Sequence, residues 1–356
     1  MRKFAKPFKM LIKVVLSLAF FSVLLSFVKK NELVEIFQQV DWFFFVVSFA
    51  VTLIMVAASC VKWRLVLALK KPDIGFCQLF KIYLIGYFFS NILPSTVGGD
   101  VVRSYYAGKL IENQSYAAVS VFVERFSGIF FLFMFVTVAP LAQPYLYKNP
   151  YIFVPALCSV GFAFITIWVW RAKRPFYLPN LVVENILGLC KWIGRKTGLG
   201  VVERIGLGLE KIYTVVIARL KRLREEMQIA VEAVKTDRSF VNRLIGLTLL
   251  FYALTWVNVY VCFLAFGVHV DFIKICAIVP AIMLVAHIPV TLLGNLGYFE
   301  SVFVFYFFLV GVGGAEAFAM GLLLRLKMLA VGVAGYGTYL VYKQKNRLEL
   351  KKTFGI

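Results

Sequence analysis

The chain has 356 residues, 61% of them hydrophobic, including 36 phenylalanines and 17 tyrosines. Soluble domains are nearer half apolar, and several runs here approach the roughly 20 apolar residues that cross a bilayer, so a soluble protein is excluded. The formal charge of +21 does not indicate nucleic-acid binding, because an excess of lysine and arginine in a membrane protein marks its cytoplasmic loops.

The apolar runs, taken in chain order, predict an all-α integral membrane protein with about six transmembrane helices. The first run follows a basic N-terminus but is too long for a signal peptide and has no small-residue cleavage site, so we expect a retained span. The predicted spans are Met10–Val28, Trp42–Val61, Tyr116–Pro140, Tyr151–Trp170, Leu244–Phe266 and Ala317–Tyr342.

Two further apolar segments are interrupted by proline and glycine. The first covers residues 78–110 and the second residues 272–311. Each half is too short for a comfortable crossing, so we predict two re-entrant helical hairpins that enter and leave the membrane on one side. With each hairpin counted in this way, every basic cluster falls on one face. Both termini are then expected to be cytoplasmic, in a multi-pass protein of the cytoplasmic (inner) membrane.

The order of these elements repeats. A span, a hairpin and a span in the first half match a span, a hairpin and a span in the second half, with the opposite direction of crossing. Such an inverted repeat is typical of transporters that hold their substrate near the midplane between two broken helices. We therefore divide the chain into a membrane half over residues 1–170, a connector over residues 171–241 and a membrane half over residues 242–356.

The connector is the one polar region. From Val202 to Val234 its apolar residues follow a helical stripe, with lysine and arginine on the opposite side. A basic amphipathic helix suits an anionic lipid surface on the cytoplasmic side. A helix packed on the membrane part of the protein explains the same stripe equally well.

The first hairpin tip, "NILPSTVGGDVVR", combines a broken backbone with two charges. Pro94 ends the incoming helix, and Gly98 and Gly99 are expected to allow positive φ and a sharp turn. Asp100 is the predicted N-cap of the returning helix, which puts Arg103 at position N3. The free N–H groups and the dipole of that helix favour an anion, and an arginine side chain suits phosphate.

The second hairpin tip, "PVTLLGNLGYFE", contains Pro289 and Gly294. There Gly297 is the predicted N-cap and Glu300 occupies position N3. Because Glu300 and Arg103 then lie at equivalent positions, we expect them to pair if the two tips meet. Such a pair either locks the hairpins together or contributes to a substrate site.

Further charges lie in the spans that follow each hairpin. Each charge at a helix centre costs roughly 2.5–3.5 kcal/mol, so seven would cost about 20 kcal/mol if they faced lipid. We therefore expect them to share an interior. The sum, four positive against three negative, leaves one positive charge for a phosphate headgroup unless Lys327 reaches the membrane surface. The seven are Asp100, Arg103, Glu124, Arg125, Glu300, Arg325 and Lys327.

Three polar residues near the tips have two interpretations each. Asn91 and Asn295 either satisfy broken backbone or contact the ligand. His287 is either a hydrogen-bonded residue at a helix end or a proton relay. The predicted substrate-binding residues are Asn91, Pro94, Gly98, Gly99, Asp100, Arg103, Glu124, Arg125, His287, Pro289, Gly294, Asn295, Gly297, Glu300 and Arg325.

No catalytic or metal-binding motif accompanies them. The six cysteines show no CxxC spacing, and two histidines are too few for a histidine-built metal site. The chain has no GxxxxGK(S/T) motif, so we expect no ATP hydrolysis. The sequence therefore predicts neither a metal ion nor a cofactor.

Together, "LPSTVGGDVVR", "VERFSG", "PVTLLGNLGYFE" and a late arginine in the last span resemble the lysylphosphatidylglycerol synthase transmembrane family. The resemblance extends from about Val40 to Tyr342. It implies a flippase-like domain that moves polar lipids, aminoacylated phosphatidylglycerol in the best-known case. Synthase members carry a soluble aminoacyl-transferase domain, which is absent here up to Ile356, so the resemblance implies a translocator without lipid-modifying activity. It carries over Pro94, Gly98, Gly99, Asp100, Arg103, Glu124, Arg125, Pro289, Gly297 and Glu300.

The sequence thus predicts a translocase for an anionic phospholipid or a polyprenyl-phosphate-linked lipid, with the headgroup between the two tips. One alternative is an intramembrane enzyme on a lipid-linked substrate, with Asp100 or Glu300 as base and His287 as acid. Another is a carrier of ions or small solutes, because half-helix ends at the midplane also serve that role.

Overall fold

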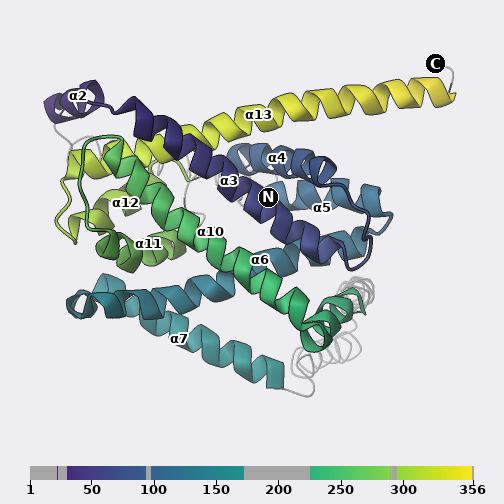
Figure 1. The fold of residues 1–356 in the computed structure, drawn as a ribbon, viewed down its shortest axis with the longest axis horizontal. Helices are drawn as coiled ribbons and strands as arrows, with labels where there is room; N and C mark the ends of the chain where they lie inside the picture. The colour runs from purple at the N-terminus through teal and green to yellow at the C-terminus, as the bar shows by residue number, and fades with distance from the viewer. Residues whose placement is uncertain are drawn as a thin grey trace, which may run out of the picture.

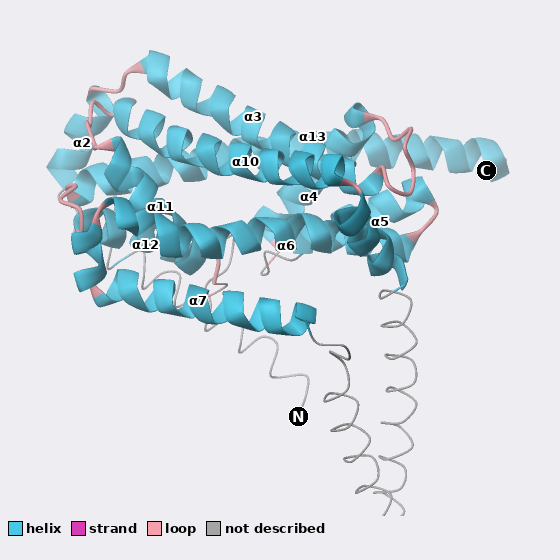
Figure 2. Ribbon diagram, turned by 60° about the horizontal axis from the view of Figure 1, so that its bottom comes forward, coloured by secondary structure: helices cyan, strands magenta, loops and turns pink. Residues whose placement is uncertain are grey.

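A computed structural model of the chain describes residues 22, 30–93, 98–171, 225–288, 290 and 295–354. Throughout these ranges the regular secondary structure is helical, as predicted, and loops join the helices (Figure 2). Most of the predicted first span and most of the connector lie outside them. Four helices are long and apolar enough to cross a membrane: α3 (Trp42–Leu67), α6 (Gln114–Val138) with the short helix that continues it, α10 (Arg238–Leu264) and the first part of α13 (Gly314–Phe354).

α3 begins at the predicted Trp42, whereas α10 begins earlier than predicted, because a cap and not hydropathy sets the start of each helix. Asp41 caps α3 by accepting a hydrogen bond from the Phe43 N–H at 2.8 Å, and Asp237 caps α10 through the Ser239 N–H at 2.8 Å. As a result α10 begins before the predicted Leu244. At its other end α3 continues past the predicted Val61 to Leu67.

The two interrupted segments form two pairs of short helices. The first pair is α4 (Phe76–Ile92) and α5 (Gly98–Ile111), and the second is α11 (Phe272–Ala286) and α12 (Tyr298–Phe308). Within each pair the helices pack against each other, and each helix is shorter than the roughly 20 residues of a crossing. Their entry and exit on one side of the membrane stays a prediction.

The helix contacts follow the predicted repeat. The second helix of each pair packs against the span that follows it, α5 on α6 and α12 on α13. The first helix of each pair packs against the last span of the other repeat, α4 on α13 and α11 on α6. The first spans of the two repeats, α3 and α10, lie side by side (Figure 1). The same order of contacts in both halves agrees with a repeat.

Each half has its own apolar core. Trp63 and Tyr116 belong to a buried cluster built mainly from α3 to α6, and Phe263 and Phe307 belong to one built mainly from α10 to α13. The remaining helices lie at the periphery: α2 (Lys30–Gln38), η1 (Ala139–Ala142), η2 (Pro144–Lys148) and α7 (Pro150–Arg171), which covers the predicted fourth span.

The described end of the connector, the helix over residues 225–236, packs on the membrane part. Glu226 accepts hydrogen bonds from Asn113 at 2.7 Å and from Lys70 at 3.3 Å, and Ala230 is buried. For this stretch the packed-connector interpretation is therefore the better one.

Candidate functional site

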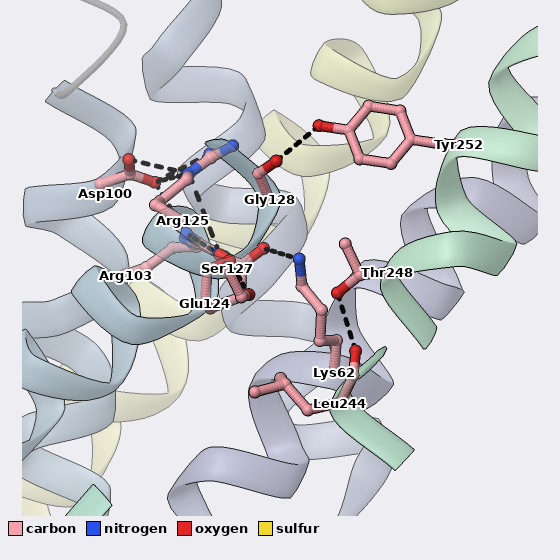
Figure 3. A network of polar contacts seen from close by, with 10 residues as sticks. All are labelled: Lys62, Asp100, Arg103, Glu124, Arg125, Ser127, Gly128, Leu244, Thr248 and Tyr252. Carbon is pink, nitrogen blue, oxygen red and sulfur yellow. Dashed lines mark hydrogen bonds and ion pairs between the residues drawn. The ribbon is translucent and has the colours of Figure 1, made fainter. Parts of the chain in front are cut away.

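Five charged side chains from three helices form what we call the tip cluster: Lys62, Asp100, Arg103, Glu124 and Arg125 (Figure 3). Arg103 joins α5 to α6, because its Nη2 atom lies 2.7 Å from Asp100 Oδ1 and 3.0 Å from Glu124 Oε2. Arg125 binds the same aspartate with two nitrogens, Nη2 at 2.9 Å from Oδ1 and Nε at 3.0 Å from Oδ2. Lys62 Nζ lies 3.7 Å from Glu124 Oε1.

The tip cluster has a closed side and an accessible side. The side chains of Arg103, Glu124 and Lys62 are 2%, 4% and 5% exposed, whereas that of Arg125 is 46% exposed. Buried charges of both signs in contact neutralise one another. Three cations against two carboxylates leave one positive charge, and Arg125 is the cation within reach of a ligand.

Arg103 is also held by aromatic rings. Its Cζ atom lies 4.5 Å from the centre of the Tyr83 ring and 5.0 Å from that of Trp63, distances at which a cation is attracted to a ring face. Its second terminal nitrogen, Nη1, is buried without a hydrogen-bond partner in the described part of the chain. A buried donor left without an acceptor is unfavourable, so this atom is suited to an additional oxygen acceptor.

The predicted role of the two glycines at the first tip is wrong. Gly98 and Gly99 are helical residues in the first turn of α5, and neither has positive φ. A Cβ atom on Gly99 would collide with the backbone carbonyl of Gly86 and with the Ser90 hydroxyl. The glycine is therefore needed for the close approach of α5 to α4, which brings Arg103 against the aromatic rings.

The predicted N-cap at Asp100 is wrong as well. Asp100 lies inside the first turn of α5, so Arg103 is not at position N3. The carboxylate is engaged by Arg103 and Arg125, which are stronger partners than a backbone N–H because both carry a charge.

The second cluster consists of Asn295, Glu300 and Arg325. As predicted, Gly297 is the N-cap of α12, with φ of 82° that suits glycine, and Glu300 accepts a hydrogen bond from its N–H at 2.8 Å. The other oxygen of Glu300 accepts one from Arg325 Nε at 2.7 Å. Arg325 also donates to the Asn295 carbonyl at 3.3 Å.

The expected pair between Arg103 and Glu300 is therefore wrong. Each residue instead binds an opposite charge on the span that follows its own hairpin, Glu124 for the first and Arg325 for the second. The reason is the packing of α5 on α6 and of α12 on α13. The two halves also share one contact: an acid in the first turn of the second hairpin helix binds an arginine 25 residues later, Asp100 with Arg125 and Glu300 with Arg325.

The polar residues next to the tips form hydrogen bonds with backbone carbonyls. Asn295 donates to the carbonyls of Ala286 and Ile288 at 2.9 and 2.7 Å and so satisfies the end of α11. Asn91 donates to the Met328 carbonyl of α13 at 3.0 Å. His287 caps α11, and its Nδ1 contacts the Met283 carbonyl. Pro94, Pro289 and Gly294 lie outside the described residues.

Lys62 is the member of the tip cluster that the sequence interpretation missed. The predicted span ended at Val61, which placed Lys62 in a cytoplasmic loop. The signal that identifies it is the apolar pattern that continues after it, at Leu65, Val66 and Leu67.

Lys327, the seventh charge, does not reach the surface: it is 1% exposed and lies apart from both clusters. The charges therefore occupy three separate interior positions. Packing links the two clusters: Asn91 at the end of α4 donates to the Met328 carbonyl of α13, three residues after Arg325. In addition, α11 packs on α6, the helix that carries Glu124 and Arg125.

Neither a metal site nor one of the two pockets lies at the hairpin tips in the described part of the chain. Among the described residues no three histidine, cysteine or acidic side chains come together as a metal site. Two pockets lie away from the tips, one beside the loops at 267–271 and 310–312 and one between α6 and α7. The arrangement at the tips is therefore that of an ion-pair network with one accessible guanidinium.

Comparison with known proteins confirms the resemblance found in the sequence. The family described as the lysylphosphatidylglycerol synthase TM region matches residues 10–335. Two UPF0104 membrane proteins of Methanothermobacter thermautotrophicus are each 23% identical to this chain, over 91% and 83% of it and 93% and 82% of their own lengths. A UPF0104 membrane protein of Methanocaldococcus jannaschii is 20% identical over 71% of this chain and 75% of its own. No solved structure matches. The chain is thus a multi-pass membrane protein that belongs to the lysylphosphatidylglycerol synthase transmembrane family.

Proposed function

We propose that this protein is a polar-lipid translocase. It moves an anionic phospholipid or a polyprenyl-phosphate-linked lipid across the cytoplasmic membrane, and both of its termini are cytoplasmic. The lipid headgroup binds between the two hairpin tips while its tails stay in the bilayer. The observation that carries the proposal is the tip cluster, with its excess positive charge on a partly exposed Arg125.

The chemistry of the tip cluster favours a phosphate. A guanidinium binds a phosphate with two parallel hydrogen bonds, as it binds the Asp100 carboxylate here. A singly charged phosphate balances the net charge of the cluster.

The second cluster supplies the other side of the proposed site. α11 packs on α6, the helix that carries Glu124 and Arg125, and Asn91 at the end of α4 donates to the Met328 carbonyl of α13, so each hairpin contacts a span of the other half. In broken-helix transporters, one repeat rocks against the other around such a site. In this protein we expect rocking to open the tip cluster alternately to the two sides.

The contacts of the two acidic tip residues favour transport over catalysis. A general base must be free to accept a proton from its substrate. Asp100 is bound by two arginines, and Glu300 by Arg325 and the Gly297 N–H. Both carboxylates are thus already engaged by positively charged partners.

The experiment is exchange of a headgroup-labelled lipid between the leaflets of proteoliposomes. A panel of anionic phospholipids and polyprenyl-phosphate lipids is compared with a zwitterionic phospholipid. We expect faster exchange of at least one anionic lipid than in protein-free vesicles, and loss of that gain in Arg125→Ala but not in Lys81→Ala, an exposed lysine of α4. Exchange no faster than in protein-free vesicles across the panel refutes the proposal, and a covalently changed lipid supports an enzyme instead.

A further inference from the structure

A lysine deep in the second half is held by uncharged groups. Lys327 of α13 is 1% exposed. Its Nζ atom lies 2.6 Å from Asn258 Oδ1 and 2.9 Å from Cys262 Sγ, both on α10. The carbonyl oxygen of Ser48 on α3 is 3.5 Å away. We call these four residues the lysine site.

The lysine site differs from the surroundings of the other buried cations. Lys62, Arg103 and Arg325 each have a carboxylate oxygen within 4 Å. Lys327 has none among the described residues, and its three neighbours on α3 and α10 are an amide, a thiol and a backbone carbonyl. An ionised amine without a counter-charge is unfavourable away from water, and such a residue within a membrane span is a candidate functional group.

The neighbours fit both protonation states of the amine. An ammonium has three N–H donors, and three acceptors surround it: the Asn258 amide oxygen, the Ser48 carbonyl and the Cys262 sulfur. A neutral amine has two donors and a lone pair. It can donate to the two oxygens and accept from the Cys262 S–H. A proton can therefore bind to Nζ and leave it without leaving any donor or acceptor of the site unpaired.

The position of the site links the two halves of the protein. Of the helices that pack against α13, namely α2, α3, α4, α10 and α12, α10 presents the one titratable side chain near Nζ in the described part, the Cys262 thiol. Ser48 belongs to the first half of the chain, whereas Lys327 belongs to the second. Arg325 of the second cluster lies two residues before Lys327, on the other side of α13. A change of charge at Lys327 therefore alters the contacts of α13, the same helix that carries Arg325 of the second cluster.

We propose that Lys327 binds and releases a proton during the transport cycle and so couples lipid movement to a proton gradient. The proton adds to the lone pair of Nζ on one side of the membrane and leaves it on the other, and no other covalent bond changes. The coupling rests on the proposed translocase function. The proton binding does not, and it is tested separately.

Proton binding is measured by NMR of the detergent-solubilised full chain labelled with ¹⁵N and ¹³C in lysine. The Lys327 signal is identified by its loss in Lys327→Met, or by its shift in Cys262→Ser where the first variant does not fold. We expect it to change from amine to ammonium at a lower pH than the exposed lysines, which titrate near 10.4. A signal that stays ammonium up to about pH 10 overturns the proposal.

Coupling is measured as the steady-state distribution of labelled lipid in proteoliposomes with a pH gradient. With one proton per lipid, a gradient of one pH unit shifts the leaflet ratio by up to about tenfold. We expect this shift in the wild type and in Lys81→Met, and none in Lys327→Met or Lys327→Arg. An unchanged shift in Lys327→Met overturns the coupling. Absence of any lipid exchange in the wild type refutes the translocase, while the NMR titration still decides whether Lys327 binds a proton.

Discussion

Removal of the Glu124 charge is the sharpest perturbation of the tip cluster. Glu124 is the acidic residue closest to two buried cations, with Arg103 Nη2 at 3.0 Å and Lys62 Nζ at 3.7 Å. Glu124→Gln keeps the size of the side chain but removes its charge. Asp100, which pairs with Arg103 and Arg125, is then the one carboxylate left in the tip cluster, and the net charge of the cluster rises from +1 to +2.

The size of the effect follows from the burial of these side chains. Breaking a buried ion pair by removing one partner costs about 3–5 kcal/mol, because the other charge remains buried. Lys62→Met alone should cost less, because Glu124 keeps Arg103 as a partner and one buried charge is gone. In the double variant the net charge returns to +1, so Lys62→Met should recover about 0.5–3 kcal/mol of the loss.

The assay is thermal unfolding of the purified protein in detergent. About 3–5 kcal/mol is expected to lower the midpoint by roughly 2–4 °C for each kcal/mol. Glu225→Gln, which changes an exposed glutamate of the connector, is the matched control. A Glu124→Gln variant as stable as this control, or a double variant less stable than Glu124→Gln, contradicts the ion-pair account of the tip cluster.

Three further predictions concern the hairpins. Gly99→Ala places a Cβ against a backbone carbonyl of α4 and should lower the free energy of unfolding by about 1–3 kcal/mol in the same assay. Gly161 has open space around it, so the control Gly161→Ala should cost nothing. Equal unfolding midpoints for the two variants argue against the close approach of α5 to α4. Glu300→Gln leaves Arg325 without its carboxylate and should cost about 3–5 kcal/mol, and an unchanged midpoint contradicts the pair. Asn295→Ala removes the donor to two carbonyls at the end of α11 and should destabilise that helix end by about 1–3 kcal/mol. The measurement is amide hydrogen exchange, which should become faster at the end of α11. Unchanged exchange contradicts the role of Asn295 in satisfying these carbonyls.

The sequence allowed the fold class and the family to be predicted, because long apolar runs and interrupted segments leave few other arrangements. It also located the N-cap at Gly297 and the glutamate at N3, since the chain there follows a local capping pattern. Such features depend on residues close in sequence, and local rules describe them.

Contacts between distant segments were not predictable in this way. Arg103 pairs with Glu124 rather than with Glu300 because α5 packs on α6, and no local pattern encodes which helix lies nearest. Gly99 was interpreted as a turn residue because glycine serves both turns and close helix contacts, and the structure distinguishes the two. Lys62 was assigned to a loop because hydropathy places a span end at the first charge, whereas a buried carboxylate allows the helix to continue past it.

The central claim is that an anionic lipid headgroup binds between the two hairpin tips. The measurement that tests it most directly is an experimental structure of the protein in bilayer discs that contain an anionic lipid which the protein transports. The account predicts headgroup density against the Arg125 guanidinium, between the N-terminal ends of α5 and α12. Lipid density confined to the outer apolar surface, with Arg125 still bound to Asp100 and no headgroup beside it, contradicts it.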